Sequence, residues 1–177
     1  MIGKKLEKAM NEQIKNELES YYIYLSMAAY FGDSDLDGMA HWMRCQAHEE
    51  TVHAMKFFDH ICDRGGKIKL MDMKQLKTEW SSPQEAWEDA FEHEQFISGT
   101  INKLVKIARE ENEYASETLL AWFTDEQIEE EANTGKIANQ LKMVSESKHG
   151  ILMIDRELSA RPFPAGSPFD PAAANAE

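Results

Sequence analysis

The chain has 177 residues, enough for one domain with a sizeable hydrophobic core. Hydrophobic residues make up 42% and charged residues 29%, with nine glycines and five prolines, so we expect a soluble, mainly helical protein rather than a disordered or fibrous one. The formal net charge of −13 would repel nucleic-acid phosphates and anionic membrane surfaces, and it makes cations the expected small partners.

Hydrophobic periodicity and turn residues predict two long helices in the first part of the chain. The first covers residues 4–31, and the second covers residues 36–64 after a short polar connection. Two glycines, Gly65 and Gly66, end the second helix. Residues 67–81 carry few helix signals and are too many for a tight turn between antiparallel neighbours, so we expect them to cross over along a bundle.

A capping box marks the start of the third helix. Ser82 can cap the helix, Pro83 suits its first position, and Glu85 can reach back to the cap. The apolar periodicity then continues to about residue 109.

Two more helices are predicted, a long one over residues 113–145 and a short amphipathic one over residues 151–159. Four long helices with two short connections and one long crossover predict an all-α four-helix bundle with a short fifth C-terminal helix. We assign residues 1–160 to this single domain. Residues 161–177 hold four of the five prolines and form an irregular tail, which by default would extend into solvent.

The sequence also indicates where the protein resides. No run approaches the ~20 consecutive apolar residues of a membrane span, and the N-terminal segment MIGKKLEKAM lacks the apolar core of a secretion signal. Cys45 and Cys62 fall in one predicted helix, too far apart to form a disulfide with each other, and reduced cysteines are typical of the cytosol. We therefore expect a cytoplasmic protein that binds neither membranes nor nucleic acids.

Each long predicted helix has an apolar seam that turns polar near its middle. The polar seam residues that could bind a metal ion are Glu17, Glu50, His53, Glu94, Gln127 and Glu130. Unpaired carboxylates in an apolar interior would cost roughly several kcal/mol each, and no seam offers Lys or Arg at that level. Any one of these residues could instead reach water at the edge of its seam, but the coincidence on four helices favours a pair of bound divalent cations, whose four charges balance four glutamates.

The chain resembles the bacterial-type non-haem ferritins over residues 6–159, in the segments NELESYYIYLSMA, EETVHAMKFFDHI, HEQF and WFTDEQIEEE. The resemblance implies a ferritin-like four-helix bundle, an iron-storage function and a homo-oligomeric cage of twenty-four subunits. It further implies a ferroxidase, an enzyme that oxidises Fe(II) with dioxygen or hydrogen peroxide at a di-iron site within each subunit. The ferric product would be stored as an oxyhydroxide mineral inside the cage.

The resemblance also assigns the iron ligands. Glu17, Glu50 and His53 would hold the first iron, and Glu50, Glu94 and Glu130 the second, with Glu50 bridging the two. Because the fourth helix offers no second histidine, the second iron would have oxygen ligands only and would bind less tightly.

Five further residues gain candidate roles from the same resemblance. Gln127 would lie beside the iron pair, close to bound oxygen or water, and Tyr24 would lie near enough to hydrogen-bond a ligand or supply an electron. An ordinary seam aromatic with a satisfied hydroxyl explains Tyr24 equally well. Glu49, Glu126 and Glu129 resemble the ligands of a third, accessory iron site, although an acidic run of this kind is also typical of a solvated helix face.

Haem is not expected, because Thr51 occupies the position where the haem-containing bacterioferritins carry the methionine that ligates haem. The main rival function is a di-iron peroxidase of the rubrerythrin kind, but the sequence lacks the Cys-x-x-Cys pair that such proteins usually carry. A DNA-protecting mini-ferritin would place its ligands between subunits, whereas this chain offers ligands on all four helices. A metal-free structural subunit would require the site to be incomplete.

Overall fold

The computed structural model describes residues 1–145 and 147–170. Its elements are α1 (Lys4–Asp33), α2 (Asp37–Asp63), α3 (Pro83–Glu110), a 3-10 turn (Tyr114–Ser116), α4 (Glu117–Val144) and α5 (Lys148–Leu158). The described residues form no strand, which confirms the all-α fold class. None of their helices is long and apolar enough to cross a membrane.

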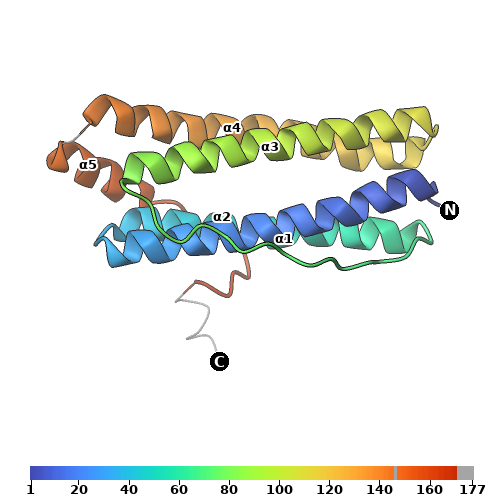
Figure 1. The fold of residues 1–177 in the computed structure, drawn as a ribbon, viewed down its shortest axis with the longest axis horizontal. Coiled ribbons are helices and arrows are strands. Elements are labelled where there is room, and N and C mark those ends of the chain that lie inside the picture. Colours follow the sequence, from blue (N-terminus) through green and yellow to red (C-terminus); the bar gives the residue numbers. More distant parts are fainter. Residues whose placement is uncertain (146, 171–177) are drawn as a thin grey trace.

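The four long helices form two antiparallel pairs. Figure 1 shows α1 beside α2 and α3 beside α4. The α3–α4 pair lies along the α1–α2 pair. The segment between α2 and α3 runs along the α1–α2 pair, as the predicted crossover requires. Side chains of α1 hold this crossover, because Asn11 Nδ2 donates to the Lys67 carbonyl at 3.0 Å and Ser26 Oγ donates to the Lys77 carbonyl at 2.8 Å.

The predicted start of α3 is correct, but the capping box is displaced by one residue. Ser82 Oγ accepts a hydrogen bond from the Glu85 amide at 3.2 Å, as expected of an N-cap. The Glu85 carboxylate instead accepts from the amide of Ser81 at 2.7 Å. The amides of Glu85 and Ser81 therefore both have a side-chain acceptor, and these two hydrogen bonds fix the start of the helix as a standard capping box does.

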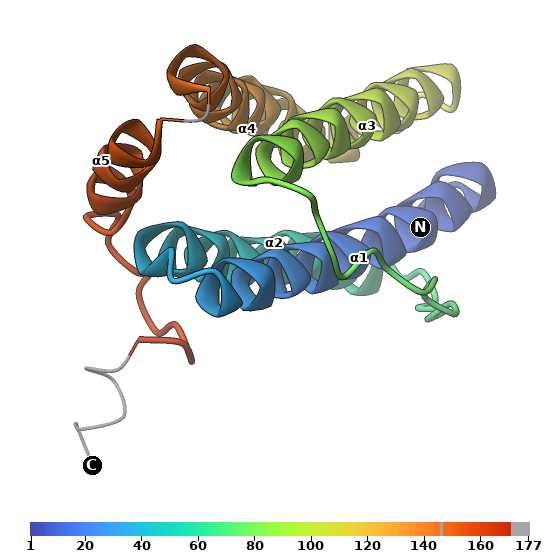
Figure 2. The same cartoon turned by 60° about the vertical axis from the view of Figure 1, so that its left-hand side comes forward.

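The last two helices begin at other residues than predicted. The chain turns at Asn112, whose φ is 55°, and then forms the 3-10 turn, so α4 starts four residues later than expected. Helix α5 starts three residues early, because Ser147 Oγ accepts from the Gly150 amide at 3.2 Å and caps it. Figure 2 shows α5 at one end of the bundle, where it contacts α2 and α4.

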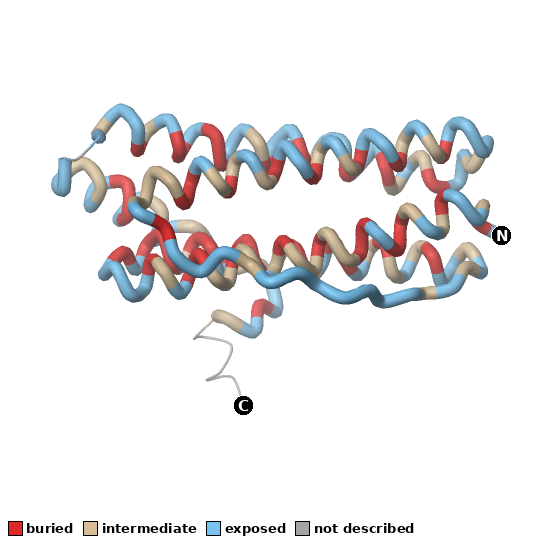
Figure 3. Tube along the Cα trace, viewed as in Figure 1, coloured by how far each residue is buried: buried red, intermediate tan, exposed pale blue. Residues whose placement is uncertain are grey.

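The hydrophobic core consists of two separate clusters along the bundle axis. One surrounds Phe31, Trp42 and Trp87 at the end nearest α5, and the other surrounds Phe57 and Phe123. Figure 3 shows the buried residues of the long helices on the sides that face the bundle centre. Between the two clusters the buried residues are polar, and this layer holds the candidate site.

The first part of the predicted tail does not extend into solvent. Residues 161–170 form neither helix nor strand, yet Ser167 is buried and Phe169 packs against the Trp42 cluster. The ring of Phe163 meets the ring of His41 edge-on, with 4.4 Å between their centres. These apolar contacts outweigh the composition, which argued for a solvated terminus. The rest of the tail, residues 171–177, lies outside the described residues.

Candidate metal centre

The four long helices bring six polar side chains to one level of the core. All six are at least 95% buried: Glu17, Glu50, His53, Glu94, Gln127 and Glu130. They lie between the two hydrophobic clusters because each replaces an apolar residue in the seam of its helix. The possibility that each one reaches water at the edge of its seam does not hold for this arrangement.

The first candidate metal position lies between α1 and α2. Glu17, Glu50 and His53 each offer one ligand atom, and these three atoms lie within 4.8 Å of one another. His53 Nδ1 is 3.4 Å from Glu50 Oε2, and Glu17 Oε1 accepts a hydrogen bond from Gln13 Nε2 at 2.8 Å. Glu17 Oε2 is fully buried and has no hydrogen-bond partner among the described residues. A buried carboxylate oxygen without a partner is the feature that a bound cation would explain.

The second candidate position, between α3 and α4, is less compact. Glu94 and Glu130 face the same polar layer, but Glu94 belongs to neither of the two clusters of close ligand atoms among the described residues. Its carboxylate accepts hydrogen bonds from the hydroxyl of Tyr24 and, at 3.2 Å, from Gln127 Nε2. The second close cluster joins His53, Glu126 and Glu130 instead. His53 therefore faces both the first position and α4.

Tyr24 donates its hydroxyl to one of the candidate ligands. Its hydroxyl is buried and satisfied, as an ordinary core tyrosine requires, but the acceptor is the candidate ligand Glu94. The Tyr24 ring also packs edge-on against Trp42 and His93, at 6.5 and 6.4 Å between centres. The residue thus lies in direct contact with the site.

The glutamates of the polar layer are too deeply buried and too close together for all of them to be ionised. Burial, followed by repulsion from Glu50, raises the pKa of both Glu17 and Glu94 to about 8. Burial and then the neighbouring Glu94 likewise raise the pKa of Glu130 well above its usual value. Without a bound cation, the carboxyl groups of Glu17 and Glu94 hold protons at neutral pH, and a cation that binds them must displace those protons.

One ion pair remains within the layer. Burial opposes the charge on His53, but its contacts with Glu126 and Glu50 outweigh burial and raise the pKa of the imidazole well above its usual value. The contact with His53 correspondingly outweighs burial at Glu50, whose pKa is lowered. The two residues that share a face at i and i+3 thus form a charged pair.

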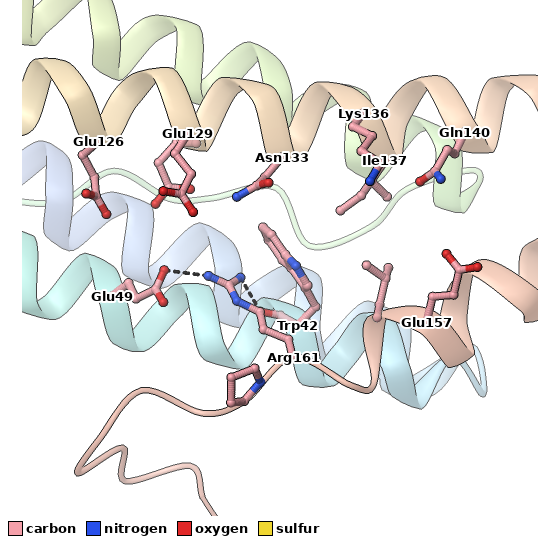
Figure 4. Close-up of a pocket in the computed structure, with 13 residues that line it drawn as sticks. Trp42, Glu49, Glu126, Glu129, Asn133, Lys136, Ile137, Gln140, Glu157 and Arg161 are labelled. Carbon is pink, nitrogen blue, oxygen red and sulfur yellow. Dashed lines mark hydrogen bonds and ion pairs between the residues drawn. The ribbon is translucent and has the colours of Figure 1, made fainter.

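The residues predicted for an accessory site line a pocket between α2, α4 and α5. Its volume is about 490 Å³, and Glu49, Glu126 and Glu129 all contribute to its wall. Figure 4 shows Glu126 and Glu129 pointing from α4 toward α2, where Glu49 points back toward them. Glu126 lies 3.8 Å from His53 Nε2, whereas Glu49 is bound by Arg161. Within the acidic run, Glu126 is half-buried and Glu129 is exposed, and both share one concave surface with Glu49 of α2.

Sequence reasoning assigned no role to two residues that contact the candidate ligands. Gln46 is fully buried and donates through Nε2 to Glu50 Oε1 and Glu130 Oε1, both at 2.8 Å. Its place in the polar stretch of the α2 seam, one turn before Glu50, could have indicated this contact. Arg161 follows the last helix, and no periodic pattern of the sequence places it near Glu49.

Comparison with known proteins identifies the family. A family model described as a ferritin-like domain matches residues 7–144. The chain belongs to the ferritin family. It is 40% identical to a bacterial non-heme ferritin of Bacteroides fragilis over 161 residues, which cover 91% of this chain and 100% of the relative. A bacterial non-heme ferritin of Staphylococcus aureus is 32% identical over 163 residues, covering 92% and 98%.

Solved structures of ferritins share the fold. An open pore ferritin from the hyperthermophilic archaeon Archaeoglobus fulgidus superimposes with a TM-score of 0.90 at 42% identity, over 92% of this chain and 99% of that one. A humanized archaeal ferritin gives a TM-score of 0.91 at 43% identity, over 93% and 99%. These ferritins confirm the resemblance seen in the sequence and the ferritin-like bundle.

Proposed function

We propose that this chain is the subunit of an iron-storage ferritin and that its central polar layer is a ferroxidase site. The observation that carries the proposal is the buried, unpartnered Glu17 Oε2 beside Glu50 and His53. Hard carboxylate oxygens and one imidazole suit Fe(II) and favour its oxidised form, Fe(III). Membership of the ferritin family supports iron as the metal that the protein handles.

Two Fe(II) ions are the substrate in this proposal. Glu17, Glu50 and His53 bind the first, and Glu50, Glu94 and Glu130 bind the second, so that Glu50 bridges them. Each Fe(II) gives up one electron. The two electrons, with two protons, convert dioxygen to hydrogen peroxide, or convert hydrogen peroxide to two waters. The carboxyl groups of Glu17 and Glu94, whose pKa values are about 8, release protons as iron binds.

The side chains around the two irons have two roles. One group orients the carboxylate ligands, and another group binds ferric iron after oxidation. Tyr24 and Gln127 both donate to Glu94 and fix the direction of its oxygens. The pocket that Glu49, Glu126 and Glu129 line begins next to Glu130, so ferric iron that leaves the pair meets further carboxylates there. These three residues would hold the third, accessory iron.

The remaining parts of the proposal concern haem, assembly and location. Thr51 donates its hydroxyl to the His48 carbonyl at 2.6 Å and has no thioether, so we propose that the protein binds no haem. Ferritin relatives support a homo-oligomer, and we propose a cage of twenty-four subunits in the cytoplasm. Residues 1–160 would form its folded domain, and residues 161–170 pack against that domain.

A test combines iron loading with sedimentation. Purified protein receives Fe(II) in air, and the rate of oxidation and the iron carried by the sedimenting shell are both measured. We expect rapid oxidation and a large shell that gains an iron core. The double variant Glu50→Ala/His53→Ala should still assemble but should lose rapid oxidation, because removing buried charge leaves the apolar clusters intact.

A matched control replaces two exposed residues of the same types of charge, Asp59→Ala/His149→Ala. This control should oxidise iron at the parental rate. An unchanged rate in the Glu50→Ala/His53→Ala variant would show that the oxidation takes place elsewhere.

A further inference from the structure

Arg161 lies just beyond the end of α5, and its guanidinium group reaches back to α2. Nη2 donates to Glu49 Oε2 at 2.6 Å, and Nη1 and Nη2 each donate to Gln46 Oε1 at 3.0 Å. The guanidinium carbon lies 4.2 Å from the centre of the Trp42 ring, a cation–π contact. Only 19% of the side chain is exposed. A positive charge is thus fixed in the wall of a pocket lined by carboxylates (Figure 4).

The backbone at Arg161 is anchored as well. His41 Nε2 donates to the Arg161 carbonyl at 2.6 Å, and Phe163 packs against the same imidazole ring. Helix α2 therefore holds the chain on both sides of the guanidinium contact. This anchoring sets Arg161 apart from an exposed arginine that meets an acidic residue by chance, because such surface pairs contribute little and move freely.

Arg161 also determines how Gln46 is oriented. A guanidinium group can only donate hydrogen bonds, so the buried Gln46 must turn its Oε1 outward to accept them. Its Nε2 then points inward and donates to Glu50 Oε1 and Glu130 Oε1, both at 2.8 Å. One arginine beyond the bundle is thereby connected through a single amide to two of the proposed iron ligands.

We propose that Arg161 is a tethered competitor for the accessory metal position. Its guanidinium holds Glu49 when no metal is bound, and a divalent ion uses Glu49 together with Glu126 and Glu129 only after the guanidinium withdraws. The inference rests on the proposed function, since it concerns the accessory site of that ferroxidase centre. The competition links the accessory position to the segment that follows α5.

The test measures zinc binding, because Zn²⁺ takes carboxylate and imidazole ligands and has no redox chemistry. Crystals of metal-free parent protein and of Arg161→Gln are soaked at stepped zinc concentrations, and anomalous scattering at the zinc edge gives the occupancy of each position. We expect Arg161→Gln to bind zinc at the accessory position on the order of tenfold more tightly, which corresponds to ~1.4 kcal/mol and to the loss of one charge-assisted contact. The position at Glu17 and His53 should fill in both proteins.

Arg156→Gln is the matched control. It removes the same charge from an exposed residue of α5 that makes no side-chain contact with Glu49, so its accessory affinity should equal that of the parent. Equal affinities in the parent and in Arg161→Gln would overturn the proposal. An equal gain in Arg156→Gln would overturn it too, since net charge alone would then explain the effect.

A second measurement needs no variant. In parent crystals with zinc at the accessory position, Arg161 should have left Glu49, and the occupancies of the two arrangements should change in opposite directions. Zinc bound to Glu49 with the Arg161 contact still at 2.6 Å would contradict the competition. Failure of the proposed function would look different, because the parent would then bind no zinc at Glu17, Glu50 and His53.

Discussion

Replacing Glu17 by glutamine should make the metal-free protein more stable at neutral pH, although it removes a proposed ligand. Burial and the neighbouring Glu50 raise the pKa of the folded-state carboxyl group to about 8, from an ordinary value of 4.5. In the unfolded chain the group releases its proton near pH 4.5. Between pH 4.5 and about pH 8 the unfolded state is therefore favoured by ionisation, and the parent protein loses stability as the pH rises.

The size of the effect follows from the same values. Each pH unit above 4.5 costs ~1.4 kcal/mol while the folded group stays protonated, so the 2.5 units up to pH 7 amount to about 3 kcal/mol. Glutamine resembles the protonated acid and does not titrate, and its amide oxygen can still accept from Gln13. Glu17→Gln should thus remove most of this cost, which corresponds to a rise in melting temperature of about 6–12 °C at pH 7 for a chain of this length.

Thermal unfolding followed by circular dichroism, with chelator present and protein concentration fixed, measures the difference. The gain should be close to zero near pH 4.5, where both states of the parent are protonated, and should grow as the pH rises through 7 toward about 8. Glu12→Gln, at an exposed position of the same helix, is the control and should change the melting temperature little at either pH. A Glu17→Gln protein that is less stable than the parent at pH 7, or whose gain does not depend on pH, would refute the reasoning.

Three further predictions test other parts of the site. His53→Ala should empty mainly the first metal position and Glu130→Ala mainly the second, as measured by anomalous scattering at the iron edge. The opposite pattern would contradict the assignment of Glu130 to the second position. Tyr24→Phe should lower the stability of the metal-free protein by roughly 1–3 kcal/mol, because a buried Glu94 oxygen loses its donor, and thermal unfolding with chelator would detect it. Protein made with haem in excess should show no co-purifying Soret band, since Thr51 offers iron no thioether.

The sequence allowed the four long helices to be predicted because local signals and the global fold agree there. Apolar seams repeat with the helical period, and Ser82, Pro83 and the glycines after α2 mark the ends. The start of α5 was missed because Gly150 suggested a break, whereas Ser147 caps the helix and places that glycine in its first turn. Gly150 fits there because its missing side chain leaves room for Val144, which would lie 2.7 Å from an added Cβ.

The candidate ligands were predictable for a different reason. Glu17, Glu50, Glu94 and Glu130 each interrupt an apolar stripe, and such an interruption is visible without any tertiary information. Which oxygens lie close enough to share an ion was not visible. That depends on the rotation of each helix and on side-chain rotamers, and it is why His53 proves to face α4 as well as α1.

The position of Arg161 could not be predicted from the sequence. It lies 112 residues from Glu49 along the chain and beyond the last helix, so neither helical spacing nor a capping pattern connects them. The contact arises because Phe163 and Phe169 pack on the bundle and bring the segment back over α2. The high proline content predicted a solvated segment. That prediction did not take account of Phe163 and Phe169, which lie among the prolines and pack on the bundle.

Hydrogen bonds and protons offset much of the negative charge in the polar layer. Gln46, Tyr24 and Gln127 donate hydrogen bonds to the glutamates of the layer, and protons on Glu17 and Glu94 remove much of the remaining charge. These hydrogen-bond donors and protons lower the cost of burying the carboxylates, and the two hydrophobic clusters hold the helices together. An ion that binds in this layer must displace the protons of Glu17 and Glu94 and compete with the amides that donate to the glutamates, so its affinity should depend on pH.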